Sequence, residues 1–115
     1  MKDQKELYEI LKTEKNIDKL QEYFKEVLDI RGFSTQTAQD KVLLLTEELG
    51  ELAKAVRKSE TNMAIDYSRL DNYDTVEGEI ADVFIVLVSL CNLLGIDLHN
   101  AILAKESKNV NREWK

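Results

Sequence analysis

Two short groups of acidic residues carry the spacing that a divalent-cation site requires. The first group is Glu47, Glu48 and Glu51, and the second is Glu79 with Asp82. Residues three positions apart lie on one face of a helix, so each group presents a pair of carboxylates. Asp82 also interrupts the most apolar stretch of the chain. An uncompensated carboxylate there would cost several kcal/mol, so something must balance its charge.

A hard divalent cation is the simplest way to balance both pairs of carboxylates. Consecutive helices most often pack as antiparallel neighbours, which would bring the two pairs face to face. Mg²⁺ is the expected ion, with Mn²⁺ as a substitute, because it is commonly shared between carboxylates and substrate phosphates. A solvated acidic helix face is the alternative for the first group. A di-iron centre would require Glu-x-x-His motifs, whereas Glu51 and Asp82 stand at the two corresponding positions.

Basic residues that suit a polyphosphate follow both acidic groups. Lys54 comes directly after the first group, and Lys105, Asn109 and Arg112 share one helical face at the spacing i, i+4, i+7. Such side chains beside a metal site can bind the phosphate oxygens that the metal leaves free. Favourable charge at the C-terminus of a helix is the alternative explanation for each basic residue.

Capping residues and apolar periodicity predict the helices that must position these side chains. The first predicted segments are 3–12, a helix capped by Asn16 that ends at Gly32, and a long helix from Ser34, Thr35 or Thr37 to about Lys58. The later ones are a helix from a capping box at Asp74 and Glu77 to about Leu94, and a helix capped by Asp97. Residues 59–74 lose the periodicity and are predicted to form a connector.

Length and composition fit one all-α domain. The chain has 115 residues, no proline and four glycines, which favours long helices over a turn-rich all-β fold. With 43% hydrophobic and 33% charged residues, it is neither a disordered tail nor a membrane protein. A net charge of -6 argues against binding to duplex nucleic acid. One cysteine, Cys91, and no signal-peptide pattern predict a reducing, cytoplasmic setting.

The helix that ends near Leu94 predicts a homo-oligomer. Its apolar residues cover nearly the whole circumference, so it needs neighbours on every side. A chain of this length does not supply enough cover by itself.

The ordered motifs resemble the MazG family of all-α nucleoside triphosphate pyrophosphohydrolases. The family pattern is EExxE on one helix and ExxD on the next, matched here by residues 47–51 and 79–82, followed by a closing K-x-x-x-N-x-x-R. The resemblance covers about residues 33–114 of a single domain, 1–115, with N-terminal helices in 1–32. It implies a four- to five-helix bundle of the all-α NTP pyrophosphatase type, completed by formation of a dimer or tetramer.

The resemblance also implies a reaction, which is hydrolysis of a nucleoside triphosphate between the α and β phosphates. By position, the metal ligands would be Glu48, Glu51, Glu79 and Asp82. Glu47 would orient a ligand or the attacking water, and Lys105, Asn109 and Arg112 would contact the phosphates. The alternative, from another class of protein, is a non-catalytic helical oligomerisation module or a nucleotide-sensing module.

Overall fold

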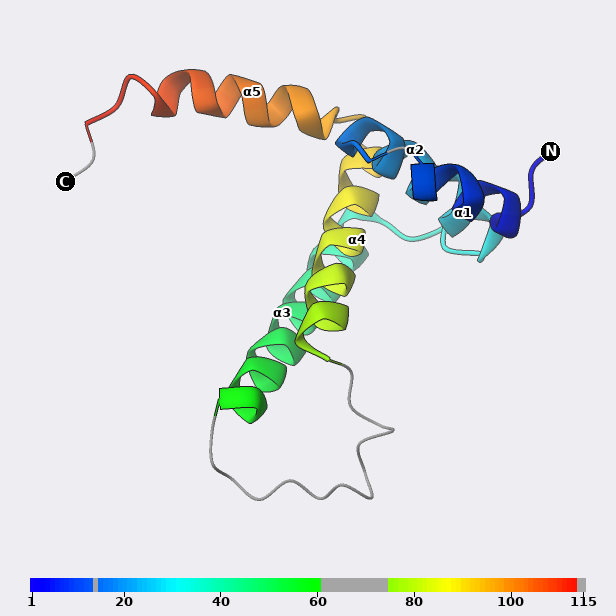
Figure 1. Cartoon of the computed structure of the whole chain (residues 1–115), viewed down its shortest axis with the longest axis horizontal. Coiled ribbons are helices and arrows are strands. Elements are labelled where there is room, and N and C mark those ends of the chain that lie inside the picture. Colours follow the sequence, from blue (N-terminus) through cyan, green and yellow to red (C-terminus); the bar gives the residue numbers. More distant parts are fainter. Residues whose placement is uncertain (14, 61–74, 114–115) are drawn as a thin grey trace. The chain divides into compact units, whose positions relative to one another are not determined.

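The described part of the chain forms five α-helices and no strand. A computed structural model describes residues 1–13, 15–60 and 75–113. The helices are α1 (Gln4–Thr13), α2 (Ile17–Ile30), α3 (Ala38–Glu60), α4 (Val76–Leu94) and α5 (Leu98–Asn109) (Figure 1). The predicted all-α class is confirmed. The predicted connector 59–74 begins later than expected, because α3 continues to Glu60, and residues 61–74 lie outside the described residues.

Local capping chemistry sets the ends of several helices as the sequence predicts. The side chains of Asn16 and Asp97 each accept a hydrogen bond from the backbone N–H three residues later, at 2.8 and 2.9 Å. These bonds satisfy amides that the first turn of a helix leaves unpaired. Gly32 (φ +87°) ends α2 and Gly95 (φ +68°) ends α4, in a backbone region that favours glycine.

The starts of α3 and α4 each use a threonine hydroxyl. Thr37 and Asp40 form a reciprocal capping box, in which each side chain accepts the other's backbone N–H at 3.1 and 2.9 Å. At α4, the Thr75 hydroxyl accepts the backbone N–H of Gly78 at 3.0 Å. The predicted cap at Asp74 lies outside the described residues.

The chain divides into two compact units, Met1–Gln36 with Val88–Lys115, and Thr37–Leu87. In the first unit, α2 packs against α1 and against α5, and Phe24 and Val27 of α2 are buried with Leu7 of α1. In the second unit, α3 and the first part of α4 run side by side in opposite directions (Figure 1). Both predicted acidic groups belong to this second unit.

The most apolar helix, α4, combines buried and exposed apolar positions. Cys91 is buried, and burial raises the pKa of its thiol. Ile80 and Leu94, by contrast, are each 53% exposed. Within the described ranges, no single helix has the length and hydropathy of a membrane span. Among the described helices, α4 and α5 taken together pass that test, and this pair is bent by 97° at the break between them.

Candidate metal centre

The register of α3 separates Glu48 from its two acidic neighbours. Glu48 is half-buried, and so are Leu45 and Leu52, three positions before it and four after it. These three side chains therefore share the packed face of α3. Glu47 and Glu51 are exposed. Glu51 lies one turn after Glu48, on the side of Glu48 that is turned away from Leu45 and Leu52, so it stands at the edge of the packed face. Within the first acidic group, it is Glu48 that lies on the packed face.

The first two turns of α4 supply the other carboxylates. Glu79 is buried, with 8% of its surface exposed, and Asp82 is half-buried. The hydroxyl of Thr75 caps this end of the helix and so sets the direction in which α4 begins. The N-terminal end of a helix carries a partial positive charge, which favours a carboxylate in the first turn such as Glu79.

Glu48, Glu79 and Asp82 meet at one place between α3 and α4. One carboxylate oxygen from each lies within 4.8 Å of the other two, and we name these residues the acidic cluster. At an effective dielectric constant of about 20, two unit charges at that separation repel by roughly 3 kcal/mol. Oε2 of Glu79 is buried and accepts no hydrogen bond from the described residues. The cluster therefore concentrates negative charge in a small region, and the buried oxygen of Glu79 has a lone pair that could bind a cation there.

The composition of the acidic cluster fits a hard divalent cation. All three ligand groups are carboxylates. Hard ions such as Mg²⁺, Ca²⁺ and Mn²⁺ favour oxygen ligands, whereas zinc and copper favour nitrogen and sulfur ligands. Oxygen ligands lie about 2.0–2.6 Å from such ions, so oxygens sharing one ion lie roughly 3–5 Å apart. The 4.8 Å limit on the cluster's oxygens falls within that range. One cation could therefore be held by two helices.

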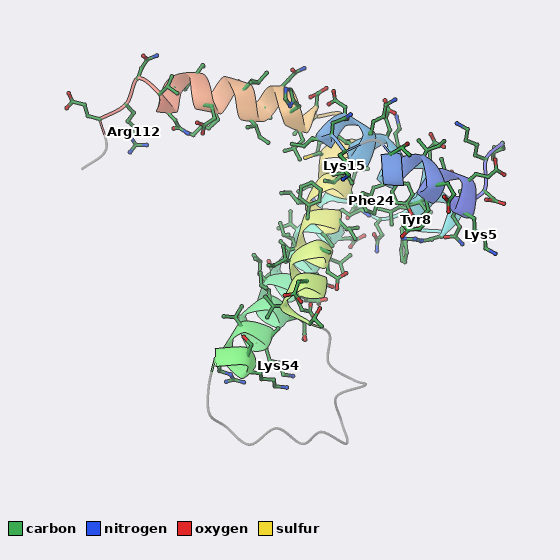
Figure 2. All side chains as sticks on the ribbon, in the orientation of Figure 1. Lys5, Tyr8, Lys15, Phe24, Lys54 and Arg112 are labelled. Carbon is green, nitrogen blue, oxygen red and sulfur yellow. The ribbon has the colours of Figure 1, made fainter. Side chains whose placement is uncertain are left out.

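The remaining residues of the predicted α3 site lie on its outer surface. Glu47 and Glu51 are exposed and stand outside the acidic cluster, and Lys54 is also exposed, further along the same helix (Figure 2). Their exposure leaves them accessible to a ligand in solution. The roles predicted for Glu47, Glu51 and Lys54 stay predictions.

A buried lysine on α3 was not expected from the sequence. Lys41 is 6% exposed and lies four positions before Leu45 and seven before Glu48, on the same packed face. Burial lowers the pKa of its ammonium group, and the negative charge of Asp40 acts in the opposite direction. Its helical register with Leu45 is the signal that could have revealed its burial.

The predicted phosphate-binding residues near the end of the chain belong to the other compact unit. Lys105 is exposed on α5, and Asn109, the last residue of that helix, donates its amide to Glu106 Oε1 at 2.8 Å. Arg112 follows the end of α5, where its backbone N–H donates to the Asn109 carbonyl at 3.1 Å (Figure 2). The predicted helical spacing therefore holds for the first two residues and ends before Arg112, whose role stays a prediction.

Fold and site together define an all-α protein in which two neighbouring helices gather three carboxylates in an arrangement that is compatible with a divalent cation. Comparison with family models gives a more specific result. The model described as the MazG nucleotide pyrophosphohydrolase domain matches residues 36–114, which include α3, α4 and α5. The chain belongs to this family, and the resemblance predicted from its motifs is confirmed.

Comparisons with individual proteins give no further information. No curated protein and no solved structure matches the chain significantly.

Proposed function

We propose that this protein is an Mg²⁺-dependent nucleotide pyrophosphohydrolase. It cleaves nucleoside or deoxynucleoside triphosphates between the α and β phosphates, and it releases the monophosphate and pyrophosphate. The observation that carries the proposal is the acidic cluster, which joins α3 and α4 inside the region matched by the family model. Removal of unwanted nucleotides from the cellular pool is the proposed role, and the cytoplasm is the proposed location.

The proposal assigns a role to each residue of the site. Glu48, Glu79 and Asp82 hold the cation, and Glu51, one turn after Glu48 on α3, adds a further ligand. A bound divalent cation supplies charge stabilisation at phosphate oxygens and lowers the pKa of bound water. Glu47 orients a ligand or the attacking water.

Basic and amide side chains complete the proposed site. Lys54 of α3 and the C-terminal set Lys105, Asn109 and Arg112 bind phosphate oxygens of the substrate. Cationic donors form short, charge-assisted hydrogen bonds to phosphate, which makes them suited to this task. We propose that residues 1–115 act as one functional domain.

A homo-oligomer, either a dimer or a tetramer, is the proposed assembly. On α3, Val42 and Leu49 lie seven positions apart on one face and are 51% and 49% exposed. Gly50 follows Leu49 in the helix, and a Cβ added there would meet nothing within 4 Å. A glycine inside a helix costs about 0.5–1 kcal/mol relative to alanine, and close approach of another helix is one reason to keep it. A second copy of the chain would cover this apolar surface.

The test is an assay of turnover with matched variants of α4. Purified protein is incubated with canonical and modified nucleoside triphosphates in Mg²⁺ or in EDTA. Turnover is expected in Mg²⁺, absent in EDTA and reduced about 100-fold or more in Glu79→Gln, because the cluster loses a charged ligand. Glu77→Gln, an exposed acid in the same turn, is the control and should retain activity. No turnover of any nucleotide by folded protein in Mg²⁺ would favour the non-catalytic oligomerisation or sensing module.

A further inference from the structure

Gln21 of α2 connects that helix to the corner between α4 and α5. Its side-chain amide donates to the carbonyl of Ile96 at 2.6 Å, and its Oε1 accepts the backbone N–H of Leu98 at 3.1 Å. Its own backbone carbonyl accepts the side-chain amide of Asn92 at 3.1 Å. All of these residues belong to the same compact unit. One residue of α2 therefore makes three hydrogen bonds with a corner more than seventy positions away.

The corner is a place where backbone groups need such partners. α4 ends at Leu94 and α5 begins at Leu98, so the connection is short. The amides of Gly95 and Ile96 donate to carbonyls of the last turn of α4, whereas the carbonyl of Ile96 and the N–H of Leu98 bond to the Gln21 side chain. The side chain of Asp97 accepts the backbone N–H of Asn100, which is the third amide of α5. The side chain of Gln21 accepts the first amide, which belongs to Leu98. A single planar amide that bonds one carbonyl and one N–H fixes both sides of the turn at once.

The direction of α5 depends strongly on this corner. Leu98 is half-buried, whereas positions 99–108 of α5 are exposed, and α2 is the helix against which α5 packs. At 1.5 Å per residue a helix of this length extends about 18 Å. A rotation of about 10° at the corner would therefore move its far end by roughly 3 Å. Displacements of about 1 Å at a reacting group can reduce rates about 100-fold.

We propose that Gln21 is a positioning residue, which fixes the direction of α5 within its own compact unit and so orients Lys105 and Asn109 for the binding of phosphate. This inference rests on the proposed function, because it requires those side chains to bind phosphate. It also assigns a task to α2, which precedes the region matched by the family model. The segment before the family domain acts on Lys105 and Asn109 through the Gln21 amide.

Substitution of Gln21 tests the inference. Gln21→Leu removes both side-chain hydrogen bonds, and Gln21→Glu keeps the acceptor for Leu98 while it loses the donor to Ile96. The matched control is Gln39→Leu, because Gln39 is an exposed glutamine on α3. We expect the KM of Gln21→Leu for the nucleotide to rise about tenfold, with a smaller change in kcat. Gln21→Glu should lie between Gln21→Leu and the wild type, and Gln39→Leu should match the wild type.

Binding measurements separate positioning from a simple loss of stability. By calorimetry, we expect the dissociation constant for pyrophosphate to rise about tenfold in Gln21→Leu at a temperature well below its Tm. Mg²⁺ affinity, which depends on the acidic cluster of the other unit, should stay within twofold of the wild type. A lower Tm with unchanged KM and unchanged pyrophosphate affinity would show that Gln21 is only structural. If Gln21→Leu does not fold, the same two readouts on Gln21→Glu decide the question.

The outcomes also distinguish this inference from the proposed function. Absence of turnover in the wild type would overturn the proposed function, and pyrophosphate binding would then still test the role of Gln21. Normal wild-type turnover with no effect of either substitution at Gln21 would overturn the positioning role alone.

Discussion

Asp82 is a half-buried carboxylate in the most apolar helix of the chain, within 4.8 Å of the carboxylates of Glu48 and Glu79. Its position is costly for stability when no cation is bound, because each neighbouring charge adds repulsion. A bound cation would relieve this repulsion, as the proposed function requires.

Asp82→Asn should therefore separate activity from stability. We expect at least a 100-fold loss of turnover, together with a gain of about 1 kcal/mol in the free energy of unfolding measured in EDTA. The stabilisation that Mg²⁺ gives to the wild type, about 2.7 kcal/mol at a concentration of one hundred times its Kd, should largely disappear in the variant. Urea unfolding of the wild type and of the variant, each in Mg²⁺ and in EDTA, measures these free energies. A variant that is less stable in EDTA and equally stabilised by Mg²⁺ would contradict this account.

The candidate site was predictable from the sequence in part. The spacing of Glu79 and Asp82, and the apolar surroundings of Asp82, indicate that both carboxylates need a partner. The separation of Glu48 from Glu51 depends on how α3 is rotated about its axis. That rotation is set by packing on α4, which local spacing alone does not define.

At the scale of the helices, residues that act on their immediate neighbours were the most predictable. Asn16 and Asp97 cap their helices, and Gly32 and Gly95 end theirs, because each acts within a few positions of itself. Lys41 was not predicted, because its charge suggested an exposed position, whereas its long aliphatic stem allows it to lie on a packed face.

Lys41 gives α3 a predicted dependence on pH. Its pKa is lowered by burial below the ordinary value of 10.5, so the unfolded chain binds this proton more tightly than the folded chain. The charged form thus costs stability at pH 7, and the cost disappears as the pH rises through the lowered pKa towards 10.5. Lys41→Met should raise the free energy of unfolding at pH 7, and its advantage should shrink at alkaline pH. Urea unfolding from pH 7 to 10 is the measurement, and an advantage that grows with pH would be inconsistent with a desolvated ammonium group.

At the scale of the whole molecule, exposed apolar side chains predict self-association. Val42 and Leu49 present such a surface on α3, and Ile80 presents another exposed position on α4. Light scattering after size exclusion should give a mass that is two or four times the chain mass of 13.3 kDa. Val42→Glu should shift the protein towards the monomer, because a buried charge at an interface is costly. Gln39→Glu, at an exposed polar position of the same helix, is the control.

A monomer at micromolar concentration in the wild type would contradict the proposed assembly. The need for a homo-oligomer was inferred from the apolar circumference of α4, whereas the sequence pattern does not specify which surfaces would meet. Intermolecular contacts depend on how surfaces match in shape, which helical periodicity does not encode.

The identity of the bond that is cleaved tests the central claim most directly. Phosphorus NMR of a nucleoside triphosphate after incubation with the protein and Mg²⁺ resolves both products in one spectrum. The account predicts a nucleoside monophosphate and pyrophosphate in equal amounts, with neither formed by Glu79→Gln. A nucleoside diphosphate with orthophosphate would contradict cleavage between the α and β phosphates.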